Sequence, residues 1–262
     1  IVGGTSKAYD LGISGGWYII CMAIGCLLFG LFFSVRVKTW ARQKNFLTYP
    51  DLIESTYDSN TRIVATVSTA LAFIGFAAGQ LAAGGAVLST LLGWNYAESL
   101  LLVSAIIIVY TASGGFMAIT YTDWVQFILL FTGIVLVGIP VSIANGGTWS
   151  ALTSNLPSAH FDPLGWGLPT MLALSVSIPM SFFVAMDSYT RMFAAKNEQT
   201  ARRGTLWAVV FLLPLAVGAV WLGLTAALLY PEVESSGDIL TKIVLDTFPV
   251  GLKGLVLVGI LA

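Results

Sequence analysis

Long apolar stretches alternate with short polar connections along almost the whole chain. A helix needs about 20 mostly apolar residues to cross the hydrocarbon core of a bilayer. Six stretches are long enough, or nearly so, and cover residues 11–34, 62–92, 96–113, 122–144, 165–194 and 204–230. Shorter apolar segments at 1–10 and 249–262 indicate partial helices at the two ends. The pattern predicts an all-α, polytopic transmembrane helical bundle that forms a single, incomplete membrane domain over residues 1–262.

The two ends and one connection add to this picture. The chain starts at Ile1 without an initiator methionine and stops at Ala262 inside an apolar run. We therefore expect it to be an internal piece of a larger protein. Before the last run, residues 235–248 carry apolar side chains at helical spacing, which is typical of a short amphipathic helix lying on a surface.

The composition excludes several classes of protein. Hydrophobic residues make up 57% of the chain and charged residues only 10%, whereas a soluble domain carries about 25% charged residues. The mean hydropathy of +0.87 excludes a secreted enzyme and a disordered scaffold. The net charge of −1 offers no basic face for phosphates, so we expect the lipid bilayer as a partner and no nucleic acid.

The positive charges are unevenly distributed among the connections. Most of the 12 Lys and Arg residues lie between Arg36 and Arg62 or between Arg191 and Arg203. These two connections are on the same side if each stretch crosses the bilayer once. The positive-inside rule then predicts that both are cytoplasmic. We expect a multi-pass protein of the cell membrane, in the inner membrane of a bacterium or archaeon.

Two carboxylates within or at the edge of the apolar stretches are candidate functional groups. Asp123 opens the fourth stretch, where it either caps a helix at the membrane interface or takes part in function. Asp187 lies in the fifth stretch, four residues before Arg191. That spacing suits either an ion pair that anchors the helix end or a functional role in a wet cavity.

A proline lies in the middle of the fifth stretch. Pro179 follows Ser175 and Ser177 and precedes Ser181. Proline removes one backbone hydrogen bond and clashes with the preceding turn, so we expect the helix to kink or break there. Broken helices at mid-bilayer often form transporter substrate sites, although kinks also serve packing alone. The residues themselves do not distinguish a substrate site from a kink that serves packing alone.

The sequence contains no convincing catalytic or metal-binding constellation. The single histidine, His160, lies in a polar connection, and the two cysteines, Cys21 and Cys26, lie in an apolar run. A nucleophile would have no base within the apolar stretches, and a metal site would have too few ligands. We therefore expect no enzyme activity and no cofactor.

Three ordered motifs resemble the sodium:solute symporter family. Residues 114–126 contain Gly-Gly followed by Thr-Asp-Trp-Val-Gln, which is similar to the family's Gly-Gly…Thr-Asp-x-x-Gln signature. Residues 48–54, Thr-Tyr-Pro-Asp-Leu-Ile-Glu, agree in order and spacing. Residues 187–196 are similar to the family's Gln-Arg-x-x-Ala-Ala-Lys segment, with Thr190 in place of the usual Gln before Arg191. The resemblance covers nearly the whole chain.

The resemblance implies the five-plus-five inverted-repeat transporter fold of the LeuT type. Residues 1–10 would be the outer half of the first core helix, the six stretches would be core helices two to seven, and 251–262 would start the eighth. The family couples solute uptake to sodium influx, so sodium is the coupling ion that the resemblance implies.

The resemblance also assigns roles to individual residues. Asp123 matches the family aspartate associated with sodium passage or with an additional sodium site, which makes it a candidate sodium ligand. The ion pathway would comprise Thr122, Asp123 and Gln126. The substrate-facing positions would be Tyr18, Met22, Ser181 and Phe182. The helix break and gate would comprise Pro179, Asp187 and Arg191.

These observations together predict a secondary active transporter. It would couple sodium influx to the uptake of a small-molecule solute by alternating access. Two alternatives remain: a sensor or receptor domain that keeps the symporter fold, and a proton-coupled or uncoupled relative.

Overall fold

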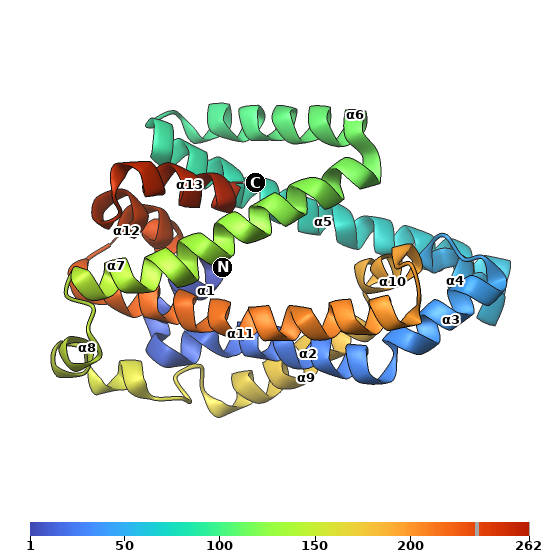
Figure 1. Cartoon of the computed structure of the whole chain (residues 1–262), viewed down its shortest axis with the longest axis horizontal. Helices are drawn as coiled ribbons and strands as arrows, with labels where there is room; N and C mark the ends of the chain where they lie inside the picture. The colour runs from blue at the N-terminus through green and yellow to red at the C-terminus, as the bar shows by residue number, and fades with distance from the viewer. Residues whose placement is uncertain (234–235, 262) are drawn as a thin grey trace. The chain divides into compact units, whose positions relative to one another are not determined.

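The computed structural model describes residues 1–233 and 236–261, and every element assigned in these ranges is a helix (Figure 1). The all-α, polytopic class predicted from hydropathy is confirmed. The first residue of the expected amphipathic segment, Ser235, and the last residue of the chain, Ala262, lie outside the described residues.

The chain divides into two compact units. The first unit comprises Ile1–Trp17, Ala78–Gly167 and Pro214–Ala262, and the second comprises Tyr18–Ala77 and Leu168–Leu213. The long helices α5 and α11 contribute residues to both units.

Membrane-length helices account for most of the described chain. By length and hydropathy the candidate spans are Val2–Phe32, Ser59–Leu92, Tyr96–Gly115, Ile119–Ala144 and Glu198–Leu229. A further span is formed if α9 and α10, which meet at a bend of 45°, are taken as one. Each candidate overlaps one of the six predicted stretches, but the first also includes residues 2–10, which the sequence analysis assigned to a separate partial helix over residues 1–10.

The first unit begins with a chain reversal. Helix α1 (Val2–Leu11) is followed by a 3-10 turn, Gly12–Gly16, before α2 (Trp17–Phe32). A Cβ built at Gly15 would lie 2.3 Å from the backbone nitrogen of Ala8. In an uninterrupted helix these two residues would be about 10 Å apart along the axis. The chain therefore folds back on itself here, so Val2–Phe32 is not one straight rod.

The remaining elements of the first unit surround a buried core. They are α6 (Tyr96–Phe131), a π-helical segment (Thr132–Gly138), α7 (Ile139–Ala144), α8 (Trp149–Asn155), two 3-10 turns (Ser158–Phe161 and Ser236–Asp238), α12 (Ile239–Thr247), α13 (Val250–Leu261) and the adjoining parts of α5 (Ser59–Leu92) and α11 (Glu198–Leu229). The residues of this core come mainly from the π-helical segment, α11, α12 and α13. Helix α6 turns back on itself at Gly115, whose φ and ψ are 58° and −163°, and Figure 1 shows this reversal in the green ribbon.

Helix α12 is more deeply buried than the sequence predicts. The segment is helical, as its apolar spacing indicates, but it does not lie open on a surface. Its residues Ile239, Leu240, Ile243 and Val244 are all 0% exposed and share a core cluster with Leu222 of α11. Adjacent pairs of apolar residues widen the apolar stripe beyond one face, so neighbours pack on more than one side of the helix.

The second unit is built around the break between two helices. It contains α2 from Tyr18 onward, α3 (Ser34–Lys44), α4 (Tyr49–Thr56), the first part of α5, α9 (Leu168–Val184), α10 (Met186–Ala194) and the first part of α11. Its core cluster consists of Phe29, Val37, Ala41, Phe46, Leu52, Tyr189, Met192 and Ala201. Because two of these residues come from α10, this short helix is anchored in the core of the unit.

Replacing Gly12 by alanine is expected to destabilise the first unit. A Cβ at this position would lie 1.8 Å from the carbonyl oxygen of His160, and the φ of 67° is unfavourable for any other residue. Overpacking of this kind costs about 1–3 kcal/mol, so the melting temperature of the purified protein should fall. Gly3→Ala is the matched control, because nothing lies within 4 Å of a Cβ at that position. Equal melting temperatures for Gly12→Ala and Gly3→Ala would contradict the close packing of this chain reversal against His160.

Candidate functional site: the broken helix and its cavity

The fifth apolar stretch is broken at Ala185, downstream of the proline. Ala185 has extended backbone angles, with φ −72° and ψ 125°, and the two helices that it separates differ in direction by 45°. Pro179 lies inside α9, which continues through it to Val184. The proline is buried beside α2, where a Cβ built at Gly25 would come within 3.0 Å of its Cα. The sequence predicted that the helix would kink or break at Pro179, whereas in the structure it breaks at Ala185.

A side-chain hydrogen bond links the two helices across the break at Ala185. The hydroxyl of Tyr189 donates to the carbonyl oxygen of Phe183 at 2.6 Å. In a continuous helix that carbonyl would accept from the backbone N–H of residue 187, and the break removes this partner. The hydroxyl replaces the lost donor, so α10 remains tied to the end of α9.

Aromatic side chains hold α10 against α2 and α4. The ring of Phe29 lies 5.8 Å from those of Phe183 and Tyr189, edge to face in both cases. Phe33, between α2 and α3, contacts Phe183 at 4.9 Å, also edge to face. The ring of Tyr49 lies 4.8 Å from that of Tyr189. Such pairs contribute about 0.5–1.5 kcal/mol each beyond the burial of their area, so the position of α10 is well determined.

Helix α4 is in turn fixed by a capping box and by one arginine. Thr48 and Asp51 bond reciprocally to each other's backbone at the start of the helix. Arg62 at the start of α5 forms ion pairs with both Asp51 and Glu54. Partial burial of Asp51 opposes its ionisation, but hydrogen bonds from Thr48 and Leu47 and the charge of Arg62 outweigh that effect. The pKa of Asp51 is therefore lowered from its ordinary value of 3.8.

A cavity of about 260 Å³ opens beside the break, and both charged residues of α10 line it. Its lining consists of Cys26, Phe29, Phe182, Asp187, Ser188, Arg191, Met192, Ala195, Thr200, Ala201, Gly204, Thr205 and Ala208. Within the described residues, no ion pair joins Asp187 to Arg191. The i,i+4 pair that the spacing allowed is therefore not formed, and both charges face the cavity.

The substrate-facing residues expected from the sequence divide into two groups. Phe182 lines the cavity and packs on α2 at Gly25, where an added Cβ would lie 2.4 Å from its ring. Tyr18 is 46% exposed, Met22 is half-buried, and neither lines the cavity. Ser181 is exposed, and its hydroxyl donates to the carbonyl oxygen of Ile178 at 2.7 Å. The cavity thus brings together three of the expected residues: Phe182, Asp187 and Arg191.

The residues expected along the ion pathway lie in the first unit. Asp123 is exposed within α6, downstream of the turn at Gly115, so it does not cap a helix as one interpretation of the sequence proposed. Among the described residues, no ion pair involves its carboxylate. Thr122 donates its hydroxyl to the carbonyl oxygen of Ile119 at 2.9 Å, and Gln126 is half-buried.

The profile of the sodium:solute symporter family matches residues 1–262 of this chain. The chain belongs to the sodium:solute symporter family. This membership confirms the resemblance inferred from the three motifs. The family and the relatives described next are transporters, which confirms the prediction that the protein is not an enzyme.

Several curated members of the symporter family are similar to the chain. The high-affinity proline transporter PutP of Bacillus subtilis is 24% identical over 239 residues, which cover 88% of this chain and 50% of that protein. The sodium/pantothenate symporter of Haemophilus influenzae is 27% identical over 272 residues, covering 98% and 54%. That of Escherichia coli is 31% identical over 160 residues, covering 58% and 32%. The chain spans about half the length of the first two of these relatives.

Sequence reasoning missed several residues that build this part of the symporter. Tyr189 lies within the quoted motif, but its role depends on the break at Ala185, which has no signature in the sequence. Thr200 and Thr205 line the cavity from α11. Both lie among charged and polar residues in the first turns of α11, so the sequence alone did not single them out.

Replacing Tyr189 by phenylalanine is expected to loosen the break while keeping the aromatic packing. The variant loses the hydrogen bond to Phe183 and leaves that carbonyl without its side-chain donor. A net loss of about 0.5–1.5 kcal/mol follows, or more if the carbonyl stays dry. Thermal unfolding of the purified protein measures the loss. Tyr57→Phe, at a side chain that is 71% exposed, is the matched control. If Tyr189→Phe and Tyr57→Phe have the same melting temperature, the hydrogen bond does not stabilise the break.

The support of α10 by α4 should depend on pH. The folded-state pKa of Asp51 lies below its ordinary value, so its contribution to stability is complete at neutral pH and disappears as pH falls through the folded-state pKa. We expect Asp51→Asn to melt at a lower temperature than the wild type near pH 7. The difference should narrow below about pH 5. Melting curves collected from pH 7 downward test this, and a constant difference would argue against the assignment.

Proposed function

We propose that this chain provides solute- and sodium-handling parts of a secondary transporter that couples sodium influx to the uptake of a small organic solute. The observation that carries the proposal is the interrupted helix α9–α10, with a charged cavity beside it, in a chain that matches the symporter family over its full length. Relatives named for sodium-coupled transport of proline and pantothenate support this class of solute.

The solute would pass along α2 and the end of α9. Tyr18 and Met22 would face it from α2, and Ser181 and Phe182 from α9. Helix α10 would act as the gate of an alternating-access cycle, because it is joined to α9 by one extended residue and carries Asp187 and Arg191 into the cavity. Pro179 would weaken α9 locally, since the carbonyl oxygen one turn earlier has lost its backbone donor.

Sodium would pass near Asp123. A carboxylate oxygen is a hard ligand that suits a small cation, and an exposed carboxylate in a membrane helix is favourable when an ion or water accompanies it. Thr122 and Gln126 would supply neutral oxygens on the same turns of α6. Asp123 would thus be a sodium ligand or a station on the way to one.

The charged connections would set the orientation. The cations between Arg36 and Arg62 and between Arg191 and Arg203 would face the cytoplasm by the positive-inside rule. The transporter would then lie in the inner membrane of a bacterium or archaeon, with the end of α10 near the cytoplasmic side.

Uptake by the full-length protein in proteoliposomes tests the proposal. Labelled proline and pantothenate would be offered first, followed by pools of other amino acids, sugars, carboxylates and amines. We expect accumulation with an inward sodium gradient and none with a matched potassium gradient. Equal uptake with both ions would refute sodium coupling. A failure to take up any solute, with sodium or a solute still raising the melting temperature, would favour a sensor instead.

The same assay tests the role of Asp123. Asp123→Asn removes a charged ligand, so the sodium concentration for half-maximal uptake should rise about tenfold, which corresponds to about 1.4 kcal/mol. Glu98→Gln, an exposed carboxylate at the other end of α6, is the matched control and should leave it unchanged. An unaltered sodium dependence in the Asp123 variant would remove this residue from the ion pathway.

A further inference from the structure

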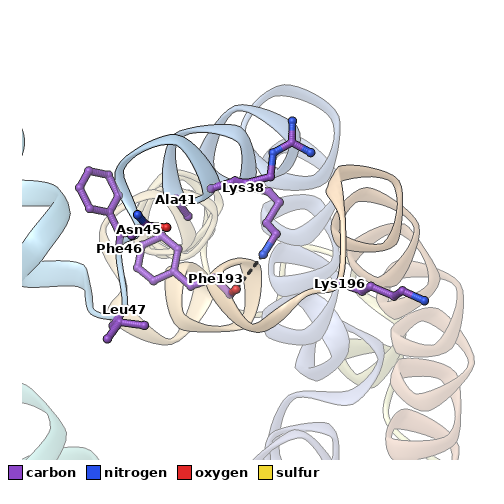
Figure 2. A pocket seen from close by; sticks show the side chains of 8 residues that line it. Lys38, Ala41, Asn45, Phe46, Leu47, Phe193 and Lys196 are labelled. Atoms are coloured by element: carbon purple, nitrogen blue, oxygen red, sulfur yellow. Dashed lines mark hydrogen bonds between the residues drawn. The ribbon is translucent and has the colours of Figure 1, made fainter.

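A second pocket of about 260 Å³ lies in the second unit, between the end of α3 and the end of α10 (Figure 2). Its lining consists of Lys38, Ala41, Arg42, Asn45, Phe46, Leu47, Phe193 and Lys196. Three of these side chains are cationic and none is acidic. The transport proposal gives none of these residues a role in binding solute or sodium, so the pocket calls for its own explanation.

The cations are only partly neutralised by the protein. The ammonium of Lys38 donates one hydrogen bond, to the carbonyl oxygen of Phe193 at 2.8 Å, which holds it at the wall of the pocket. An ammonium has three donors, so two remain for a ligand. Arg42 contacts Glu198 at 3.2 Å through one nitrogen, and its side chain is 68% exposed. Lys196 forms no ion pair or hydrogen bond within the described residues, and Figure 2 shows its side chain pointing away from Lys38 and Phe193.

Below the cations the pocket is apolar. The rings of Phe46 and Phe193 lie 6.3 Å apart, and Ala41 completes the floor. Leu47 at the edge is 81% exposed, and Trp40, on the same helix as Lys38, is 52% exposed. A water-facing anion site would not need this exposed apolar rim. A cationic mouth over an apolar floor, on a helix that also carries an exposed tryptophan, is typical of the headgroup level of a membrane.

The sequence positions of the pocket residues agree with a location at the headgroup level of the membrane. Helix α3 begins at Ser34, directly after α2 ends at Phe32, and the wall opposite is formed by the last residues of α10. Both α2 and the α9–α10 pair belong to candidate spans. The pocket is therefore lined by the segment that follows one candidate span and by the end of another.

We propose that this pocket binds the phosphate of an anionic phospholipid. Lys38 would contact the phosphate, Lys196 would turn its side chain toward the phosphate from the end of α10, and Arg42 would add positive potential. The first methylenes of an acyl chain would lie on Phe46 and Leu47. The apolar floor distinguishes this occupant from free phosphate, which shares the same charge but gains nothing from the rings.

The test compares lipids and variants of the full-length protein in neutral detergent. Melting temperatures are measured during titration with phosphatidylglycerol, with phosphatidylcholine and with inorganic phosphate. We expect phosphatidylglycerol alone to stabilise the wild type. In the double variant Lys38→Gln/Lys196→Gln its apparent affinity should fall about tenfold. The matched control is Arg36→Gln/Lys44→Gln, which removes two cations of α3 that do not line the pocket, and its affinity should not change.

Each alternative result overturns the proposal in a different way. An equal loss in both double variants means general surface charge and no defined pocket. Stabilisation of the wild type by inorganic phosphate to the same extent as by the lipid means a free-anion site. Lys38 also donates a hydrogen bond to Phe193, and its loss could lower the melting temperature of the double variant Lys38→Gln/Lys196→Gln without lipid. In that case the single variant Lys196→Gln tests the lipid site instead. Lys196→Gln should still lower the lipid affinity about threefold, and unchanged affinity refutes the lipid site.

Discussion

A helix inside a bilayer has no water to satisfy its backbone, so each interruption must be repaired by the protein itself. This constraint explains the local chemistry at two of the places where the chain leaves helical geometry. At the 3-10 turn after α1, the indole of Trp166 donates to the carbonyl oxygen of Ser14 at 2.8 Å, and the hydroxyl of Ser14 donates to that of Leu11. At Ala185 the phenol of Tyr189 replaces the missing donor. Polar side chains next to the breaks are thus part of the backbone's hydrogen bonding.

The position of α10 follows from the hydrogen bond of Tyr189 and from packing against α2 and α4. Aromatic rings from α2 and α4 surround Tyr189, and Arg62 holds α4 in place through two carboxylates. The short helix is therefore fixed at one side by rings and left open at the other, where Asp187 and Arg191 face the cavity.

Hydropathy predicted the helical class and the approximate spans because the bilayer imposes both requirements on the sequence. The motifs likewise brought out Asp123, Asp187 and Arg191. The break at Ala185 was not predictable, since a missing N–H at Pro179 is visible in the sequence whereas backbone angles at an alanine depend on what packs around it. The burial of α12 was missed for a related reason: periodicity reveals an apolar face but not how many neighbours cover it. The spacing of Asp187 and Arg191 likewise allowed an ion pair that is not formed.

The hydrogen bond from Tyr189 to Phe183 also bears on the order in which this region is assembled. Its donor and acceptor, Tyr189 and Phe183, are separated by one short loop of chain, so bringing them together requires little loss of conformational entropy. The bond needs no residue from α11, which is synthesised later. This hydrogen bond is therefore available to the segment before α11 is made, and the rings of Phe29 and Tyr49 that pack around Tyr189 come from helices synthesised earlier.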